Sequence, residues 1–113
     1  MSLRIAESRH GAVSVLRPEG PFTAEAVEPL MAAFEKARGK SLGRVVLDCA
    51  AAPHADSEGL EALADLADQM ARSGLSLKLI GCAETLRETF ELTELTPQFE
   101  YFADANAAVR SFL

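Results

Sequence analysis

The sequence has no tryptophan, a single tyrosine and only two cysteines, and it contains no long apolar run. A helix that spans a bilayer needs about 20 predominantly apolar residues, so no membrane insertion is expected. Cys49 and Cys82 lack CxxC or Cys/His spacing, which disfavours a disulfide scaffold and a zinc site. The N-terminus has no apolar run behind a basic start, so we predict no secretory signal and a cytoplasmic location.

Basic residues are also few. Lys and Arg number 11 against 17 Asp and Glu, and the formal net charge is −6. Nucleic acids and anionic membranes select for clustered basic side chains, whereas the one cluster here is short and comprises Lys36, Arg38 and Lys40. We therefore expect no nucleic acid partner. Neither GxxxxGK[ST] nor GxGxxG occurs, so no nucleotide-phosphate loop and no cofactor is predicted.

The residues that are present describe an ordinary globular protein. Hydrophobic residues make up 49% of the 113 positions and charged residues 25%. A chain of this length usually forms one domain with a substantial core, so we expect a single domain over residues 3–113.

Hydrophobic periodicity along the chain switches between the period of a strand and that of a helix. The expected strands lie near residues 3–5, 13–16, 44–49, 75–80 and 99–101, and the expected helices near 23–39, 57–73, 83–92 and 104–112. The order β-β-α-β-α-β-α-β-α predicts a small α/β fold with a mixed sheet of four or five strands and about four helices. In the third helix we expect Leu86, Phe90 and Thr93 to be buried. If the first helix begins near Glu25, Pro29 falls in or near its first turn, where it is tolerated; deeper inside, it would kink the helix.

The candidate site is the loop that follows Asp48, because sites in open α/β sheets gather at the carboxyl ends of strands. On its structural interpretation, Asp56 or Ser57 caps a helix and Glu58 lies favourably in its first turn. On its functional interpretation, Ser57 accepts a phosphoryl group at the helix N-terminus. Gly59 would then leave space for the approaching active site of a partner.

The charges near Ser57 predict the direction of such a switch. The neighbouring residues Asp56, Glu58, Glu61 and Asp65 are acidic, and no basic residue lies nearby in sequence. A phosphate adds about −1.5 to −2 charges. It would therefore weaken docking to a partner rather than order the loop.

Other interpretations of these residues are weaker. Ser57, His54 and Asp56 are the residue types of a hydrolase triad, but they lie too close together in one loop and no GxSxG elbow is present. We therefore do not expect an enzyme. Cys49 and Cys82 end two neighbouring predicted strands and are interpreted as small buried apolar residues.

The chain resembles the STAS domain family of sulphate-transporter tails and bacterial anti-sigma factor antagonists. The resemblance runs from about residue 3 to residue 112, and its most specific part is the Asp-Ser pair after a Val-Val-Leu-Asp strand. It is carried by the segments Val45–Asp48, Asp56–Leu60, Leu77–Gly81, Glu91–Leu95 and Phe102–Ala105. The family usually has a small residue where Glu58 stands and a glycine where Glu94 stands.

The resemblance implies a partner-switching regulator. The unmodified antagonist of that family binds a GHKL-type serine kinase that is also an anti-sigma factor. The kinase then phosphorylates the antagonist, which ends the complex, and a PP2C-type phosphatase removes the phosphate. By position, Ser57 is the acceptor and Asp56 the supporting acid. The implied partner-binding loop comprises His54, Asp56, Ser57, Glu58, Gly59 and Leu60. The alternative is a constitutive STAS subunit of a transport ATPase or another large machine, without phosphoregulation.

Overall fold

The computed structural model describes residues 3–113 and has the predicted order of elements. The five strands are β1 (Arg4–His10), β2 (Val13–Glu19), β3 (Val45–Asp48), β4 (Leu77–Ile80) and β5 (Phe99–Phe102). The four α-helices are α1 (Ala24–Ser41), α2 (Ser57–Arg72), α3 (Glu84–Leu92) and α4 (Ala105–Arg110), and a 3₁₀ turn covers Thr96–Gln98.

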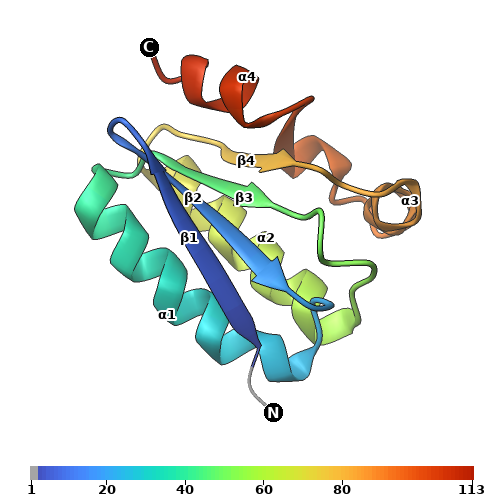
Figure 1. Cartoon of the computed structure of the whole chain (residues 1–113). Coiled ribbons are helices and arrows are strands. Elements are labelled where there is room, and N and C mark those ends of the chain that lie inside the picture. The colour runs from blue at the N-terminus through green and yellow to red at the C-terminus, as the bar shows by residue number, and fades with distance from the viewer. Residues whose placement is uncertain (1–2) are drawn as a thin grey trace.

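The strands form one mixed sheet in the order β1-β2-β3-β4-β5. β1 and β2 are an antiparallel hairpin, and every later neighbour is parallel. Helices α1 and α2 cover one face of the sheet and α4 lies across the other (Figure 1). The predicted mixed α/β fold is therefore confirmed. The carboxyl end of β3 leads into the loop that precedes α2. Because β3 is parallel to both of its neighbours, the carboxyl ends of β2, β3 and β4 lie at the same edge of the sheet.

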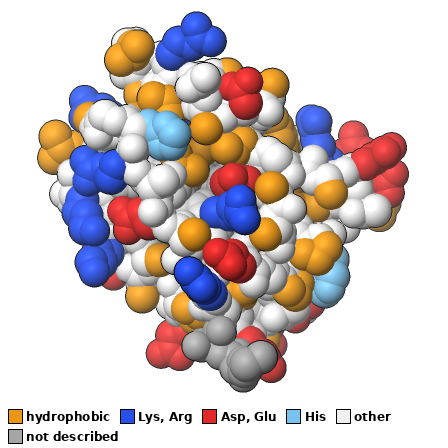
Figure 2. All heavy atoms as spheres, viewed as in Figure 1, with side chains coloured by type: hydrophobic (Ala, Val, Ile, Leu, Met, Phe, Trp, Pro, Cys, Tyr) orange, Lys and Arg blue, Asp and Glu red, His pale blue; other side chains and the backbone are white. Residues whose placement is uncertain are grey.

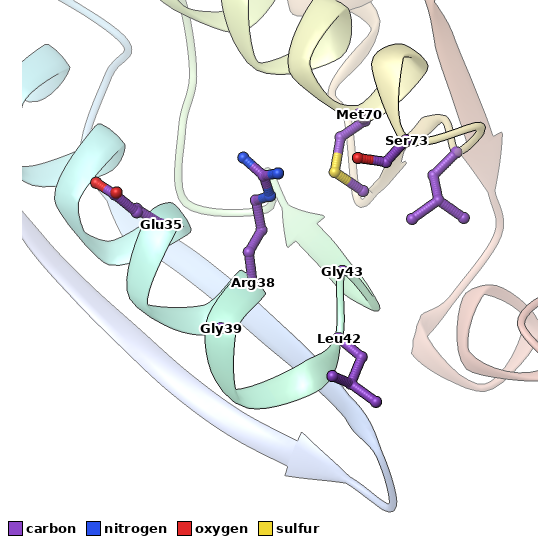
Figure 3. Close-up of a pocket in the computed structure, with 8 residues that line it drawn as sticks. Glu35, Arg38, Gly39, Leu42, Gly43, Met70 and Ser73 are labelled. Atoms are coloured by element: carbon purple, nitrogen blue, oxygen red, sulfur yellow. The ribbon is translucent and has the colours of Figure 1, made fainter.

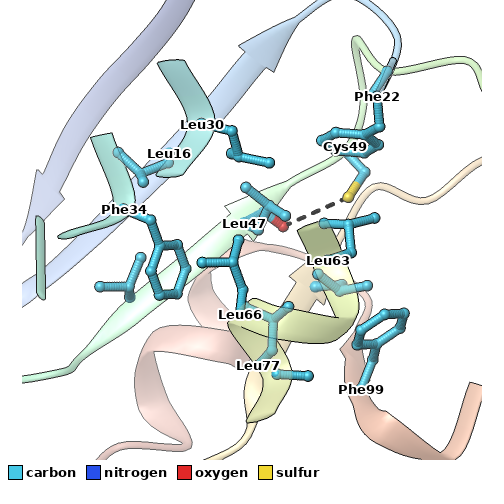
Figure 4. Packing of buried hydrophobic residues seen from close by; sticks show 14 of the residues in the cluster. Leu16, Phe22, Leu30, Phe34, Leu47, Cys49, Leu63, Leu66, Leu77 and Phe99 are labelled. Atoms are coloured by element: carbon cyan, nitrogen blue, oxygen red, sulfur yellow. Dashed lines mark hydrogen bonds between the residues drawn. The ribbon is translucent and has the colours of Figure 1, made fainter. Parts of the chain in front are cut away.

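The main core lies between the sheet and the helices α1, α2 and α3. Alternate residues of the strands, such as Leu16, Leu47 and Leu79, point into it and are almost completely buried. Phe22 and Phe34 fill it from the α1 side, and Leu63 and Leu66 from α2 (Figure 4). This packing fixes the position at which α2 begins.

The opposite face of the sheet contains a buried cation beneath the C-terminal segment. Lys78 is only 7% exposed, and its ammonium group donates a 2.7 Å hydrogen bond to Glu100. The same group lies 5.1 Å from the ring centroid of Phe102 and 4.6 Å from that of Phe112. Both the carboxylate and the ring faces stabilise the charge that burial would otherwise disfavour.

The first helix differs from its predicted bounds. It runs on past Gly39 to Ser41 and ends where Leu42 takes the left-handed conformation with φ 54°. The helix begins at Ala24, so Pro29 is its sixth residue and lies in the second turn. It is tolerated because the carbonyl that its missing N–H would have bonded belongs to the exposed residue Glu25.

The third helix also corrects an expectation. Leu86 and Phe90 are buried as predicted, but Thr93 is exposed. The helix ends at Leu92, and the Thr93 hydroxyl donates a 2.8 Å hydrogen bond to the carbonyl of Thr89.

The turn after Thr93 explains that exposure. Glu94 takes a φ of 62°, and the backbone N–H of Leu95 returns to the carbonyl of Phe90 at 2.8 Å. This is the Schellman arrangement, and it turns Leu95 rather than Thr93 back toward the core.

Candidate functional site

The candidate site begins at the carboxyl end of β3, where the chain leaves the sheet. An Asp48 carboxylate oxygen accepts a 2.9 Å hydrogen bond from the N–H of Ala50, which turns the backbone out of the strand. The N–H of Cys49 donates to the carbonyl of Ile80 at 2.8 Å and so extends the pairing with β4 by one bond. These contacts fix the start of the loop that leads to α2.

Asp56 is the N-cap of α2, one of the two residues predicted for that role. One of its carboxylate oxygens accepts a 2.9 Å hydrogen bond from the N–H of Gly59, and the other accepts a 3.2 Å bond from the N–H of Ala24. Ala24 is the first residue of α1. A single carboxylate therefore satisfies unpaired donors at the N-termini of two helices and holds them together.

The backbone of Phe22 forms the second connection at this site. Its N–H donates to the carbonyl of His54 and its carbonyl accepts from the N–H of Asp56, both at 2.9 Å. Phe22 thus pairs with Ala55 as an isolated parallel bridge. The loop before Ser57 is consequently bound to the core by backbone hydrogen bonds on both sides of that bridge, and we infer that it is held in one conformation.

Gly59 belongs to this connection and not to an open surface. It is buried, and a Cβ atom at this position would lie 1.8 Å from the carbonyl oxygen of Phe22 and 2.4 Å from its carbonyl carbon. The expectation that Gly59 leaves space for a partner is therefore wrong. The missing side chain instead allows the backbone of Phe22 to lie directly against the first turn of α2.

The other predicted site residues are brought to the same edge of the sheet. Ser57 is the first residue of α2 and is exposed, as are Glu58 and His54. Leu60 is half-buried and packs against the main core. The structure therefore presents the Ser57 hydroxyl on a rigid helix start beside its capping acid.

An acidic groove lies next to Ser57, between α1 and α2. Its volume is about 440 Å³, and it is lined by Val27, Met31, Glu58, Glu61, Ala62 and Asp65. The acids come from α2, whereas Val27 and Met31 come from α1. The sequence-based prediction places the docking site in the loop and α2 alone and does not include α1; the signal available was the i, i+4 spacing of Val27 and Met31.

The arrangement does not support a hydrolase. The hydrogen bonds of Asp56 come from backbone N–H groups at two helix starts, and within residues 3–113 none joins His54 to Asp56 or to Ser57, as a triad requires. Among residues 3–113, no group of three or more His, Cys, Asp and Glu side chains is placed to hold a metal ion. In the same part of the chain, no helix is both long and apolar enough to cross a membrane.

A larger cavity of about 550 Å³ lies at the other end of the helices. It is formed where α1 and α2 end, and its lining residues include Arg38, Leu42, Met70 and Ser73 (Figure 3). Arg38 donates a 3.0 Å hydrogen bond to Gln69 across it. On the face of the molecule seen in Figure 2, basic side chains form a row along the α1 edge, and elsewhere they alternate with acidic groups.

These features define a small α/β module. Its mixed sheet of five strands is covered by helices, and the capped helix α2 presents an exposed serine at the carboxyl edge of the sheet. The sequence profile of the STAS domain matches residues 4–108, and the chain belongs to that family. No curated protein matches the chain in sequence.

Solved structures share the fold at low sequence identity. A candidate anti-sigma factor antagonist from Thermotoga maritima is 17% identical with a TM-score of 0.83, and the match covers 95% of this chain and 92% of that one. The unphosphorylated anti-sigma factor antagonist SpoIIAA is 17% identical with a TM-score of 0.76, covering 96% of each chain. The murine anion transporter Solute Carrier 26 member A9 is 17% identical with a TM-score of 0.70, covering 92% of this chain but 18% of the transporter.

Proposed function

We propose that this STAS protein is an anti-sigma factor antagonist-like regulator. In the unmodified state it binds a GHKL-type serine kinase that also acts as an anti-sigma factor. Phosphorylation of Ser57 ends that complex, and a PP2C-type phosphatase restores it. The protein itself is a binding module, as STAS antagonists generally are, and not an enzyme.

One observation carries this proposal: an exposed serine opens α2 directly after the acid that caps it. A kinase must reach the hydroxyl of its substrate, and Ser57 lies on the surface at the edge of the sheet. The Asp56 carboxylate and the Phe22 backbone hold the surrounding loop in place. A partner can therefore bind the unmodified loop without first ordering it, which lowers the entropic cost of association.

The electrostatics of the helix start support an off-switch. Asp56 already accepts the N–H of Gly59, so an added phosphate on Ser57 does not gain that donor. Glu58 and Glu61 lie within one helical turn and repel the new charge. Phosphorylation would change the net charge of the chain from −6 to about −8, and the added charge would lie at the docking loop. A partner surface that complements the unmodified loop then meets an excess of negative charge.

The docking surface in this proposal comprises His54, Asp56, Ser57, Glu58 and Leu60, and it continues along the acidic groove. Gly59 contributes by shaping the helix start. The groove combines the apolar side chains Val27 and Met31 with a wall of carboxylates. That combination suits a partner segment that carries apolar residues flanked by Lys or Arg.

The proposal is tested by the kinase reaction. Purified protein incubated with its cognate kinase and ATP should gain one phosphate, and Ser57→Ala should gain none. Ser73→Ala is the matched control, because Ser73 is an exposed serine at the opposite end of the same helix. Glu58→Ser places a small residue beside the acceptor and reports whether the carboxylate slows the kinase. A phosphate at a residue other than Ser57 contradicts the proposal.

A constitutive role in a larger machine is the second candidate. It is favoured by one finding, the shared fold with a segment of a murine anion transporter. Co-purification from the native host separates the two candidates. A small kinase together with a sigma factor supports partner switching, whereas a transport ATPase supports the constitutive role.

A further inference from the structure

The chain has two cysteines, and they lie at the ends of two neighbouring strands next to the docking loop. Cys49 follows the last residue of β3, and Cys82 comes two residues after the end of β4. The strands are parallel neighbours with Asp48 opposite Ile80, and the N–H of Cys49 continues this pairing to the carbonyl of Ile80. Neighbouring strands lie about 4.8 Å apart. The register places Gly81 opposite Cys49, so Cys82 is a diagonal neighbour one residue further along. With a rise of about 3.3 Å per residue, the two Cα atoms are expected about 5.8 Å apart, within the range of about 4.4–6.8 Å that a disulfide spans.

A glycine directs the second thiol toward the first. Strand alternation alone would point Cys82 to the opposite face of the sheet from Leu79. Gly81 instead takes the left-handed conformation with a φ of 69°, which interrupts the strand alternation after β4. Cys82 consequently packs against the main core cluster that contains Cys49. The two thiols are near enough to shift each other's pKa, while the hydrogen bond of the Cys49 thiol runs to the carbonyl of Leu47 at 4.0 Å.

The two sulfurs have different environments. Cys49 is 1% exposed and packs among core residues (Figure 4), whereas Cys82 is only partly buried. Cys82 also lines two surface cavities of about 420 and 230 Å³, and Arg87 lines both. The neighbouring Cys49 thiol and the Arg87 guanidinium lower the pKa of Cys82, and together they outweigh burial and Asp48, which act in the opposite direction. The Cys82 thiol and burial raise the pKa of Cys49.

We propose that Cys82 and Cys49 form a peroxide-oxidisable pair, in which Cys82 is the reactive thiol and Cys49 resolves it to an intramolecular disulfide. This is a modification site separate from Ser57, and it does not depend on the proposed function. A partly exposed thiol that shares a cavity with a cation and has a second thiol close by is the arrangement typical of redox-sensing cysteines.

The reaction balances with a peroxide as the oxidant. The Cys82 thiolate attacks one oxygen of hydrogen peroxide, an S–O bond forms, the O–O bond breaks, and the departing hydroxide takes a proton to become water. The Cys49 sulfur then attacks the Cys82 sulfur. An S–S bond forms, the S–O bond breaks, and the leaving hydroxide takes the Cys49 proton as a second water. Both sulfurs are oxidised and one peroxide is reduced.

The disulfide would affect the loop that begins at Cys49. It would link the ends of β3 and β4 covalently at the base of the loop that leads to Asp56 and Ser57. Oxidation should thus protect the backbone N–H groups of residues 50–55 from exchange with solvent.

The experiment treats the reduced protein with one equivalent of hydrogen peroxide and follows free thiols, intact mass and a non-reducing peptide map. The wild type should lose both thiols and two hydrogens of mass, with a Cys49–Cys82 cross-linked peptide and no change in oligomeric state. Cys49→Ala should stop at a sulfenic acid on Cys82 that dimedone traps. Cys82→Ala should keep its remaining thiol at least about tenfold longer, because Cys49 is buried.

Three results would overturn the proposal. The first is a wild-type protein that acquires oxygen on Cys82 without a cross-link. The second is a disulfide between two copies of the chain, and the third is a Cys82→Ala variant that is oxidised as fast as the wild type. Circular dichroism of each reduced variant establishes that it is folded, and Arg87→Gln should slow the first step several-fold while the same disulfide is formed. The kinase reaction at Ser57 is measured separately on the reduced protein, so failure of either proposal leaves the other intact.

Discussion

The contact between Gly59 and Phe22 makes a prediction that opposes ordinary helix propensity. Gly59 lies inside α2, and replacing an interior helical glycine with alanine usually stabilises a protein by about 0.5–1 kcal/mol. Gly59→Ala should do the reverse. Its new methyl group would lie 1.8 Å from the Phe22 carbonyl oxygen and 2.9 Å from the Phe22 Cβ.

The size of the loss follows from what must move. The obstructing atoms belong to the backbone of a fully buried residue, so no flexible side chain can rotate away. Overpacking of this kind costs about 1–3 kcal/mol or more. Displacing Phe22 also strains its two backbone hydrogen bonds to the loop, each worth about 1 kcal/mol. We expect a total loss of about 3–5 kcal/mol, a large share of the stability of a small domain.

Urea unfolding followed by circular dichroism measures this loss, and Gly39→Ala is the matched control. Gly39 is also helical, but nothing lies within 4 Å of the position that its Cβ would take. Gly39→Ala should therefore raise the unfolding midpoint slightly while Gly59→Ala lowers it strongly. Equal effects of the two substitutions would refute the assigned packing of the helix start.

Three further substitutions test other parts of the structure. Asp56→Ala removes caps from two helices and should cost about 2 kcal/mol, against about 1 kcal/mol for Asp104→Ala, which caps α4 alone; equal losses in urea unfolding would contradict the double cap. Lys78 lowers the pKa of Glu100 below its ordinary 4.5, so the contribution of this pair to stability is complete above that value and is lost as the pH falls through the lowered pKa. Lys78→Met should therefore reduce the difference between the unfolding midpoints at neutral and acidic pH, and an unchanged difference would argue against the pair. Glu94→Gly should stabilise the protein by about 1 kcal/mol, measured in the same way, because Glu94 holds a φ of 62° that glycine adopts without strain; a loss of stability would contradict that geometry.

The order of elements was accessible from the sequence because it depends on local periodicity. The cap at Asp56 was likewise predicted as one of two candidates, since its contact with Gly59 spans three residues. Its second contact, with Ala24, joins residues 32 positions apart, and no local pattern encodes it. The role of Gly59 could not be predicted for the same reason, because the atom that occupies the space beside it is the carbonyl oxygen of Phe22, which is distant in sequence.

The helix ends show a related limit. The hydrophobic pattern predicts that the first helix ends near residue 39, yet α1 continues to Ser41 because the left-handed residue that ends it is Leu42. Thr93 has the spacing of a buried helical residue, but α3 ends before it. The left-handed conformation of Glu94 turns the chain so that Leu95, and not Thr93, packs against the core. In both helices a non-glycine residue takes the position where glycine is usually expected, so composition gave no warning.

The most direct test of the proposed function is site-resolved mass spectrometry of the protein after incubation with its cognate kinase and ATP, combined with a binding measurement on the product. We expect a single phosphate on Ser57 of the wild type and no phosphate on the Ser57→Ala variant. We also expect the affinity of the protein for the kinase to fall markedly once the phosphate is present. Phosphorylation at another residue, or a Ser57-phosphorylated protein that binds the kinase as tightly as the unmodified one, would contradict the proposed function.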